Sequence, residues 1–238
     1  MERRYDVLLC DADNTIFDFN QAEERAFYLT CAQMGIEGTA ELLARYCGIN
    51  EALWKLFEQG GIEQKVLRVR RFEQLLEAIG RGDIDGRQMS QAYMTHLGMQ
   101  SVPIAGAVEA VARWSRILPV VIVTNGIAAV QHGRMAGSEV KAYISGMVIS
   151  EEVGAAKPDP KMLYAGMEMA GVKDVRRALM LGDSLSSDIG AAANAGVDAC
   201  WYNPGGEKNG KNLPVTYEIR SLDEVDAILT GEKEAVRA

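Results

Sequence analysis

Five short apolar runs, separated by segments with helical periodicity, are the feature that most constrains the fold of this chain. They predict strands at residues 7–10, 120–123, 147–150, 178–181 and 197–201. Each run is almost entirely apolar, which is typical of strands that are covered on both faces of a sheet. Because helices separate most of these strands, the pattern predicts an α/β fold, a doubly wound parallel sheet with helices on both faces.

A helical block interrupts this alternation directly after the first run. Apolar residues recur at helical spacing in segments 21–34, 51–59, 62–79 and 87–97, and no strand-like alternation separates them. We therefore predict an all-helical domain, residues 20–97, inserted into an α/β core that consists of residues 1–19 and 98–238.

Composition and charge exclude several classes of protein. The chain has 238 residues, 48% of them hydrophobic, and a net charge of −8. An acidic chain without a long basic run is a poor candidate for binding nucleic acid. No apolar stretch approaches the roughly 20 residues that cross a bilayer, and the N-terminus has no signal-peptide core. The four cysteines show no CxxC spacing. We expect a cytoplasmic protein, a monomer or homodimer, with no membrane partner.

The first apolar run ends at two acidic residues, Asp11 and Asp13. If the strand geometry continues, both side chains lie on the same side of the pleat. Two carboxylates that close repel each other and raise one another's pKa. The commonest reason for such a pair is a hard cation such as Mg²⁺, which takes oxygen ligands. The alternative is an Asp-rich turn with Asn14 at its tip.

Polar residues also follow the later runs. Thr124 and Asn125 end the second run, Asp183 and Asp188 follow the fourth, and Lys157 stands in a loop between them. In open α/β sheets, ligands bind beyond the carboxyl ends of the strands. Hydroxyl, amide and ammonium groups suit phosphate oxygens, whereas carboxylates suit Mg²⁺.

Each of these elements has an ordinary interpretation by itself. Thr124-Asn125-Gly126 is compatible with a simple turn, and Lys157 is compatible with a solvated lysine. Asp183 and Asp188 are compatible with a helix-capping pair. The order of all the elements, and their placement at strand ends, is what favours a site that holds a phosphoryl group and a divalent cation.

The motifs Asp11-x-Asp13-x-Thr15, Thr124-Asn125, Lys157-Pro158 and Gly182-Asp183-x-x-x-x-Asp188 together resemble the four motifs of the haloacid dehalogenase (HAD) superfamily. The resemblance covers the whole chain and implies a HAD-type Rossmannoid core with a helical cap. The stretches DADNTIFDFNQAEERAF, TNGIAAVQHGRMAGS, ISEEVGAAKPDP and GDSLSSDI are similar to the subgroup of pyrimidine 5′-nucleotidases.

The resemblance also implies roles for individual residues. Asp11 is the expected nucleophile, and Asp13 the expected general acid and base. The expected Mg²⁺ ligands are Asp11, the backbone carbonyl of Asp13, and Asp183, with Asp188 orienting a metal-bound water or standing behind the ligands. The expected phosphate-binding residues are Thr124, Asn125 and Lys157.

The function implied is a Mg²⁺-dependent phosphatase that hydrolyses nucleoside monophosphates through an aspartyl-phosphate. The alternatives within the superfamily are a sugar-phosphate or phosphoglycolate phosphatase, or a phosphomutase. Dehalogenase members lack the second acid, so Asp13 favours phosphoryl chemistry. Two other classes stay open: a phospho-accepting signalling module and a catalytically inactive binding protein.

Overall fold

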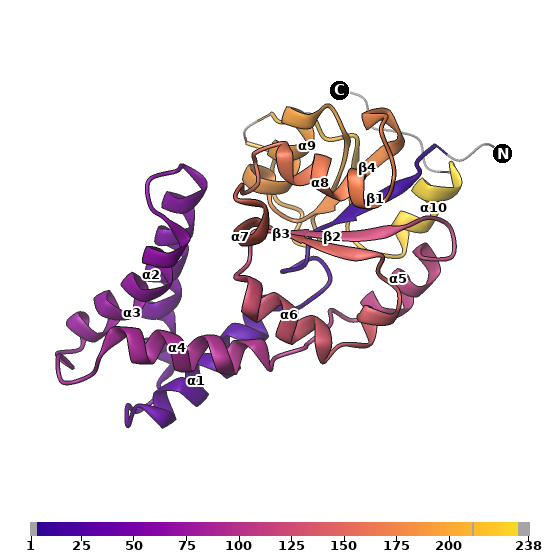
Figure 1. Cartoon of the computed structure of the whole chain (residues 1–238). Helices are drawn as coiled ribbons and strands as arrows, with labels where there is room; N and C mark the ends of the chain where they lie inside the picture. The colour runs from indigo at the N-terminus through magenta and orange to yellow at the C-terminus, as the bar shows by residue number, and fades with distance from the viewer. Residues whose placement is uncertain (1–3, 211, 233–238) are drawn as a thin grey trace. The chain divides into compact units, whose positions relative to one another are not determined.

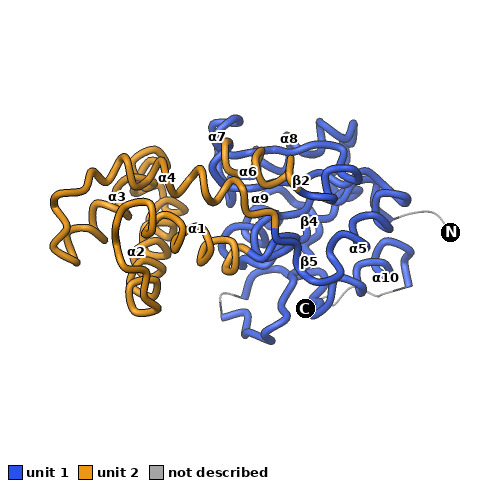
Figure 2. The backbone as a smooth tube through the Cα atoms, turned by 90° about the horizontal axis from the view of Figure 1, so that it is seen from below, with its two compact units in different colours: residues 1–18, 102–128, 138–238 blue, residues 19–101, 129–137 orange. Residues whose placement is uncertain are grey.

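The computed structural model describes residues 4–210 and 212–232, so residues 1–3, 211 and 233–238 of the predicted core lie outside the described residues. The chain divides into two compact units, which Figure 2 distinguishes by colour. Unit 1 comprises Met1–Asp18, Val102–Ala128 and Ser138–Ala238, and unit 2 comprises Phe19–Ser101 and Ala129–Gly137.

Unit 1 is built on a six-stranded sheet in which every pairing is parallel, in the order β3-β2-β1-β4-β5-β6. The strands are β1 (Val7–Cys10), β2 (Val120–Thr124), β3 (Gly146–Ile149), β4 (Ala178–Gly182), β5 (Asp198–Tyr202) and β6 (Tyr217–Ile219). The predicted α/β class with a parallel sheet is confirmed. The strand β6 was not predicted from the sequence. It has only three residues, and the middle one is exposed, so its apolar pattern is too short to recognise.

Helices cover both faces of this sheet. On one face lie α8 (Lys161–Met169) and α9 (Gly190–Ala195), and on the other lie α5 (Ala107–Trp114) and α10 (Glu224–Thr230) (Figure 1). The remaining helical turns of unit 1 are η1 (Glu139–Ala142), α7 (Ser150–Val153), η2 (Val175–Arg177) and the π-helical η3 (Leu185–Ile189).

Alternate residues of the central strands pack against α8 and α9. Val7, Leu9, Val121 and Met180 belong to this core cluster. Gly166 of α8 lies so close to the sheet that a Cβ there would come within 2.7 Å of Leu9 Cδ2. The intervening strand residues are buried as well. Burial on both faces is the physical reason that the strand sequences are continuous apolar runs.

Unit 2 is helical. It contains α1 (Phe19–Gln33), α2 (Ala40–Glu58), α3 (Gln64–Ala78), α4 (Gly86–Gly98) and most of α6 (Ala128–Ala136). Its interior holds an aromatic stack in which the Tyr46 ring lies 4.9 Å from Phe27 and 5.3 Å from Phe72, between centroids. Helix α2 begins eleven residues before the predicted helix, at Ala40, where Thr39 caps it by accepting from the Leu42 amide.

The division into units differs from the predicted boundaries at residue 19, at residues 98–101 and at residues 129–137, all of which the sequence-based division placed in the core. Gly133 packs against α4 so closely that a Cβ on it would lie 2.7 Å from the Gly98 carbonyl oxygen. Arg134 Nε donates to the Gln100 carbonyl at 3.1 Å. These contacts join a segment after β2 to the end of α4. The two segments are more than 30 residues apart, so a local sequence pattern could not predict that they pack together.

The two segments that flank residues 19–101 pair with each other inside unit 1. Phe17 and Pro103 form an antiparallel bridge. The Asp18 amide donates to the Val102 carbonyl at 2.9 Å, and the Ile104 amide donates to the Ile16 carbonyl at 2.8 Å. The chain therefore leaves unit 1 after Asp18 and returns at Val102 along one short pair of hydrogen-bonded segments. It leaves unit 1 a second time for residues 129–137.

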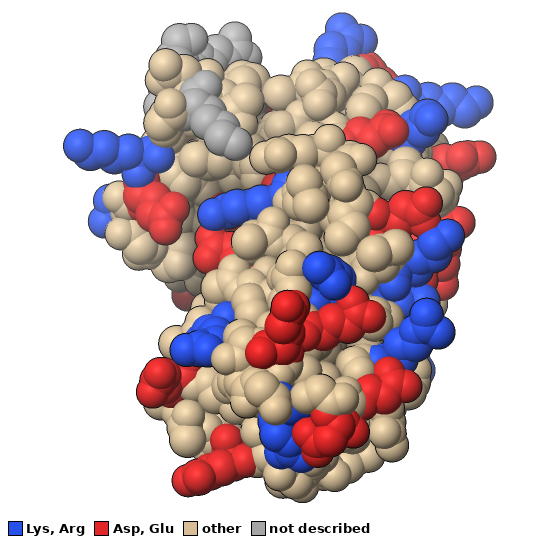
Figure 3. Space-filling model, turned by 90° about the vertical axis from the view of Figure 1, so that its left-hand side faces the viewer, with Lys and Arg blue, Asp and Glu red and all other residues tan. Residues whose placement is uncertain are grey.

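Charged side chains of both signs alternate over the face drawn in Figure 3, and basic side chains do not gather into one patch there. Within the described ranges, no helix combines the length and the apolar character that crossing a membrane requires.

Candidate active site

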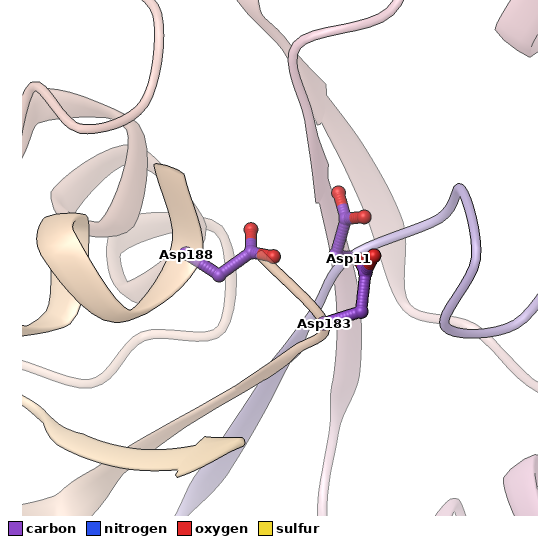
Figure 4. Close-up of side chains that lie close together, drawn as sticks. All are labelled: Asp11, Asp183 and Asp188. Carbon is purple, nitrogen blue, oxygen red and sulfur yellow. The ribbon is translucent and has the colours of Figure 1, made fainter. Parts of the chain in front are cut away.

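Three carboxylates converge at the carboxyl edge of the sheet. Asp11, Asp183 and Asp188 each offer an oxygen, and these oxygens lie within 4.8 Å of one another. Figure 4 shows Asp11 and Asp183 projecting from the ends of neighbouring strands, with the Asp188 carboxylate directed toward them from a helical turn. The parallel topology causes this convergence, since β1 and β4 are adjacent and end at the same edge.

Asp11 is placed by the last step of the β1–β4 ladder, because its amide donates to the Leu181 carbonyl at 2.9 Å. The strand does not continue to Asp13. Residues 12–17 form a tight turn in which the Phe17 amide donates to the Ala12 carbonyl, and Asn14 has a φ of +58°. The pleat argument therefore does not apply to the acid pair. Asp13 is half-buried, and its side chain is not part of the three-carboxylate cluster.

Lys157 lies at the centre of the cluster and is 1% exposed. Its ammonium group donates to Asp11 Oδ1 at 2.5 Å, to Asp188 Oδ1 at 2.6 Å and to the Val123 carbonyl at 2.7 Å. An ammonium group has three donors, so each has one acceptor. The alternative interpretation of Lys157 as a solvated lysine is therefore excluded, because this side chain is enclosed and bound at three points.

Burial and charge shift the ionisation of these groups. Burial raises the pKa of Asp11 well above its usual value, against the opposing effect of Lys157. Burial and the nearby Asp188 raise the pKa of Asp183 to about 7. Burial alone would lower the pKa of Lys157, but the carboxylates of Asp11 and Asp188 outweigh it and raise that pKa. The single positive charge of Lys157 therefore does not balance the negative charges that the three carboxyl groups carry when they are all ionised.

Asp188 is fully buried and folds back over the end of β4. Its Oδ2 accepts from the Ser184 amide at 3.0 Å. A Cβ on Gly182 would lie 2.3 Å from the Asp188 carboxyl group, so only glycine leaves room for it. The helical turn is capped by Ser184, whose hydroxyl accepts from the Ser187 amide at 3.2 Å. Ser184 is therefore the residue that caps this helical turn. Asp183 and Asp188, for which the sequence also allowed a capping role, belong instead to the carboxylate cluster.

The residues after β2 line the same edge. Thr124 is buried, and its Oγ1 accepts from the Gly126 amide at 3.0 Å, which fixes the turn. The Asn125 side chain binds the backbone of Lys157 twice: Oδ1 accepts from the Lys157 amide at 2.7 Å, and Nδ2 donates to the Lys157 carbonyl at 2.8 Å. The structure therefore joins Asn125 to Lys157, and Thr124 fixes the turn that carries Asn125.

The donor set suits a hard divalent cation. Asp11, Asp183 and Asp188 supply only carboxylate oxygens, they are mostly enclosed, and one ammonium group stands against three potential negative charges. Oxygen-only sites of this kind take Mg²⁺ or a similar ion in preference to a soft metal.

Comparison with known proteins decides the family. The sequence model described as "Hydrolase: haloacid dehalogenase-like hydrolase" matches residues 5–196, a span that includes every residue of the cluster.

The chain belongs to the haloacid dehalogenase-like hydrolase family.

Several members of this HAD family resemble the chain over nearly its full length. The pyrimidine 5′-nucleotidase PynA of Streptococcus pneumoniae is 34% identical over 224 residues, 93% of each chain. The pyrimidine 5′-nucleotidase YjjG of Escherichia coli is 31% identical over 228 residues, 95% of this chain and 98% of YjjG. A crystal structure of the HAD-hydrolase YfnB of Bacillus subtilis, bound to magnesium, is 34% identical and superposes with a TM-score of 0.88, covering 95% of this chain and 99% of that one.

The HAD site contains two residues for which no role was predicted from the sequence. Thr15 is buried and its Oγ1 donates to Asp183 Oδ1 at 3.3 Å. Trp201 Nε1 donates to the Asp183 backbone carbonyl at 2.8 Å. The position of Thr15 in the first motif was a signal that could have identified it. Trp201 lies on β5 and carried no signal, because its partner is adjacent only through the β4–β5 pairing.

Proposed function

We propose that this HAD hydrolase is a Mg²⁺-dependent phosphatase that hydrolyses nucleoside monophosphates, with pyrimidine nucleotides as the preferred class. The observation that carries the proposal is the hydrogen-bonded Asp11–Lys157 pair within a buried carboxylate cluster. That cluster pairs a nucleophile with an enclosed cation at the edge where α/β sheets bind ligands. The similarity to PynA and YjjG, both named pyrimidine 5′-nucleotidases, supports the substrate class.

In the proposed reaction, a carboxylate oxygen of Asp11 attacks phosphorus and forms an aspartyl-phosphate, while the bond from phosphorus to the 5′-oxygen breaks. Asp13 gives its proton to the departing 5′-oxygen, which leaves as the nucleoside. Asp13 then takes a proton from water as that water attacks the aspartyl-phosphate, releasing inorganic phosphate and restoring Asp11. The half-buried position of Asp13 suits a group that exchanges protons with substrate and water.

Charge is the main obstacle to this reaction, because an anionic nucleophile approaches an anionic phosphate. Lys157 offsets part of this repulsion, and we assign Lys157 and Thr124 to the phosphoryl oxygens of the bound substrate. A divalent cation would supply the remaining positive charge. Asp11, the Asp13 carbonyl and Asp183 would hold it, and Asp188 would orient a metal-bound water or stand behind these ligands. We propose Mg²⁺ as that ion, because every side chain in the cluster offers oxygen only.

The reaction class is tested with p-nitrophenyl phosphate in the presence and absence of Mg²⁺. We expect many turnovers per protein molecule, with turnover lost on chelation and in Asp11→Asn. A single turnover would indicate a phospho-accepting module instead. Full activity in an Asp11→Asn preparation that mass spectrometry shows free of deamidation would remove Asp11 from the mechanism.

The substrate class is tested separately by comparing kcat/KM for UMP, dUMP, dTMP, AMP, phosphoglycolate and hexose phosphates. We expect the pyrimidine nucleotides to be favoured. A tenfold preference for purine nucleotides or for sugar phosphates would reject the pyrimidine nucleotidase proposal and leave the phosphatase proposal intact. Transfer of phosphate to a second sugar hydroxyl, rather than release to water, would indicate a phosphomutase.

The proposed partner is thus a small phosphorylated metabolite rather than nucleic acid or a membrane. The cytoplasmic location and the monomeric or homodimeric state remain predictions, which fractionation and light scattering test.

A further inference from the structure

The backbone of Lys157 requires partners that its own segment does not supply. Lys157 lies between α7 and α8, outside any helix or strand, and is almost fully buried. Buried backbone amide and carbonyl groups in proteins are nearly always hydrogen-bonded. Here both partners come from one side chain, because Asn125 accepts from the Lys157 amide at 2.7 Å and donates to its carbonyl at 2.8 Å.

The same short segment also binds the other end of Lys157. The Val123 carbonyl, two residues before Asn125, accepts from the Lys157 ammonium group at 2.7 Å. Residues 123–125 therefore hold both the backbone and the side-chain terminus of a residue 32 to 34 positions away. The remaining two ammonium donors then point at Asp11 and Asp188.

We propose that Asn125 is a positioning residue: its side chain sets the location of the Lys157 ammonium group between Asp11 and Asp188. Resemblance to the family implied that Asn125 binds the phosphoryl group, and this inference replaces that role. The positioning role of Asn125 rests on the proposed function only because one of its two tests measures phosphatase activity. Displacing a charge-stabilising group by about 1 Å can cost about a hundredfold in rate.

The chain contains a matched control. Asn209 makes the same two-point contact with a different loop residue: Oδ1 accepts from the Leu213 amide at 3.1 Å, and Nδ2 donates to the Leu213 carbonyl at 2.8 Å. Asn209→Ala removes the same chemistry as Asn125→Ala but leaves Lys157 untouched. We expect Asn209→Ala to keep wild-type kcat/KM.

A double-mutant cycle with Lys157→Ala tests the proposal. We expect Asn125→Ala to lower kcat/KM for p-nitrophenyl phosphate by roughly 10- to 100-fold in the wild-type background. In the Lys157→Ala background, the same change should cost less than about twofold, because its only route of action is gone. Losses that multiply would show that Asn125 acts on the substrate directly and would overturn the proposal.

A structural readout is independent of activity. We expect a crystal structure of Asn125→Ala to show the Lys157 ammonium group beyond hydrogen-bond distance of Asp11 or Asp188, and an unmoved group would overturn the proposal. If Asn125→Ala fails to fold, Asn125→Asp takes its place in both experiments, since it keeps the acceptor for the Lys157 amide. Absence of phosphatase activity in the wild type would reject the proposed function, while the crystal structure would still decide the role of Asn125.

Discussion

The carboxyl group of Asp188 occupies the space that a side chain on Gly182 would need, because a Cβ added there would lie 2.3 Å from it. This contact places Asp188 over the end of β4, where its Oδ1 accepts from Lys157 at 2.6 Å. Gly182 has an ordinary backbone conformation, so the requirement for glycine is one of space rather than of φ. The glycine of the fourth motif is thus part of the geometry of the cluster.

The first prediction is that Gly182→Ala displaces Asp188 and disrupts the cluster. We expect kcat/KM for p-nitrophenyl phosphate to fall by about a hundredfold, because a shift of about 1 Å in a positioned group has this effect. Gly48→Ala is the matched control, since a Cβ at this helical position meets nothing within 4 Å. Gly48→Ala should stabilise the protein by up to about 1 kcal/mol. Wild-type activity in Gly182→Ala would contradict the prediction.

The second prediction concerns pH and the proposed cation. The pKa of Asp183 is about 7 because of burial and the nearby Asp188. Below that pH the carboxyl group is protonated and neutral, and a cation must displace the proton to bind. Raising the pH through 7 should therefore increase Mg²⁺ affinity. The part of the gain that comes from Asp183 should be about tenfold per pH unit below its pKa and should level off above it.

Isothermal titration with Mg²⁺, from one pH unit below to one above that pKa, measures this dependence together with the protons released. The Asp183→Asn variant has no proton to displace at this position. The Mg²⁺ affinity that it retains should therefore lack the part of the pH dependence that comes from Asp183. A flat affinity profile in the wild type would contradict the predicted role of Asp183.

The third prediction separates the two steps of the reaction through Asp13. A nucleoside leaving group needs a proton, whereas p-nitrophenolate leaves without one. Asp13→Asn should lower kcat for UMP by about 10²- to 10⁴-fold, the usual contribution of general acid–base catalysis. With p-nitrophenyl phosphate, the first step should persist and the second should slow, giving a burst of p-nitrophenolate and an accumulating aspartyl-phosphate. Equal losses for both substrates, without a burst, would contradict the acid role.

The fourth prediction concerns a buried polar cluster inside the helical unit. Asn50 Nδ2 donates to Glu23 Oε1 at 2.7 Å, and Arg71 Nη1 donates to Asn50 Oδ1 at 3.0 Å. The guanidinium group of Arg71 also lies 4.7 Å from the centroid of the Tyr93 ring. Asn50 therefore bridges two buried groups of opposite charge, and its loss leaves both with a missing hydrogen bond.

Asn50→Ala should lower the free energy of unfolding of the helical unit by roughly 2–3 kcal/mol, because hydrogen bonds to buried charged groups are costly to remove. Urea unfolding followed by tryptophan fluorescence, with Trp54 reporting on this unit, measures the change. The control is Arg70→Gln on α3, next to Arg71, which loses only an exposed pair with Glu73 and should change stability by less than about 0.5 kcal/mol. Equal effects of the two changes would contradict the prediction.

The sequence by itself determined the parallel sheet and the identity of the clustered acids. Continuous apolar runs such as residues 7–10 and 178–181 are local signals, because a strand that is buried on both faces needs apolar side chains at every position. The acids follow these runs directly, and the carboxyl ends of parallel strands share one edge. The sequence alone therefore predicts that Asp11 and Asp183 belong to one site.

Only the tertiary structure decided which groups position that site. The partner of Asn125 lies 32 residues away in the sequence, and Trp201 reaches Asp183 across the β4–β5 pairing. The turn at residues 12–17, which ends the strand before Asp13, and the packing of Gly133 on Gly98 are equally invisible to local patterns. Periodicity reports which side of an element is buried, whereas these contacts depend on which elements become neighbours, and long-range packing sets that.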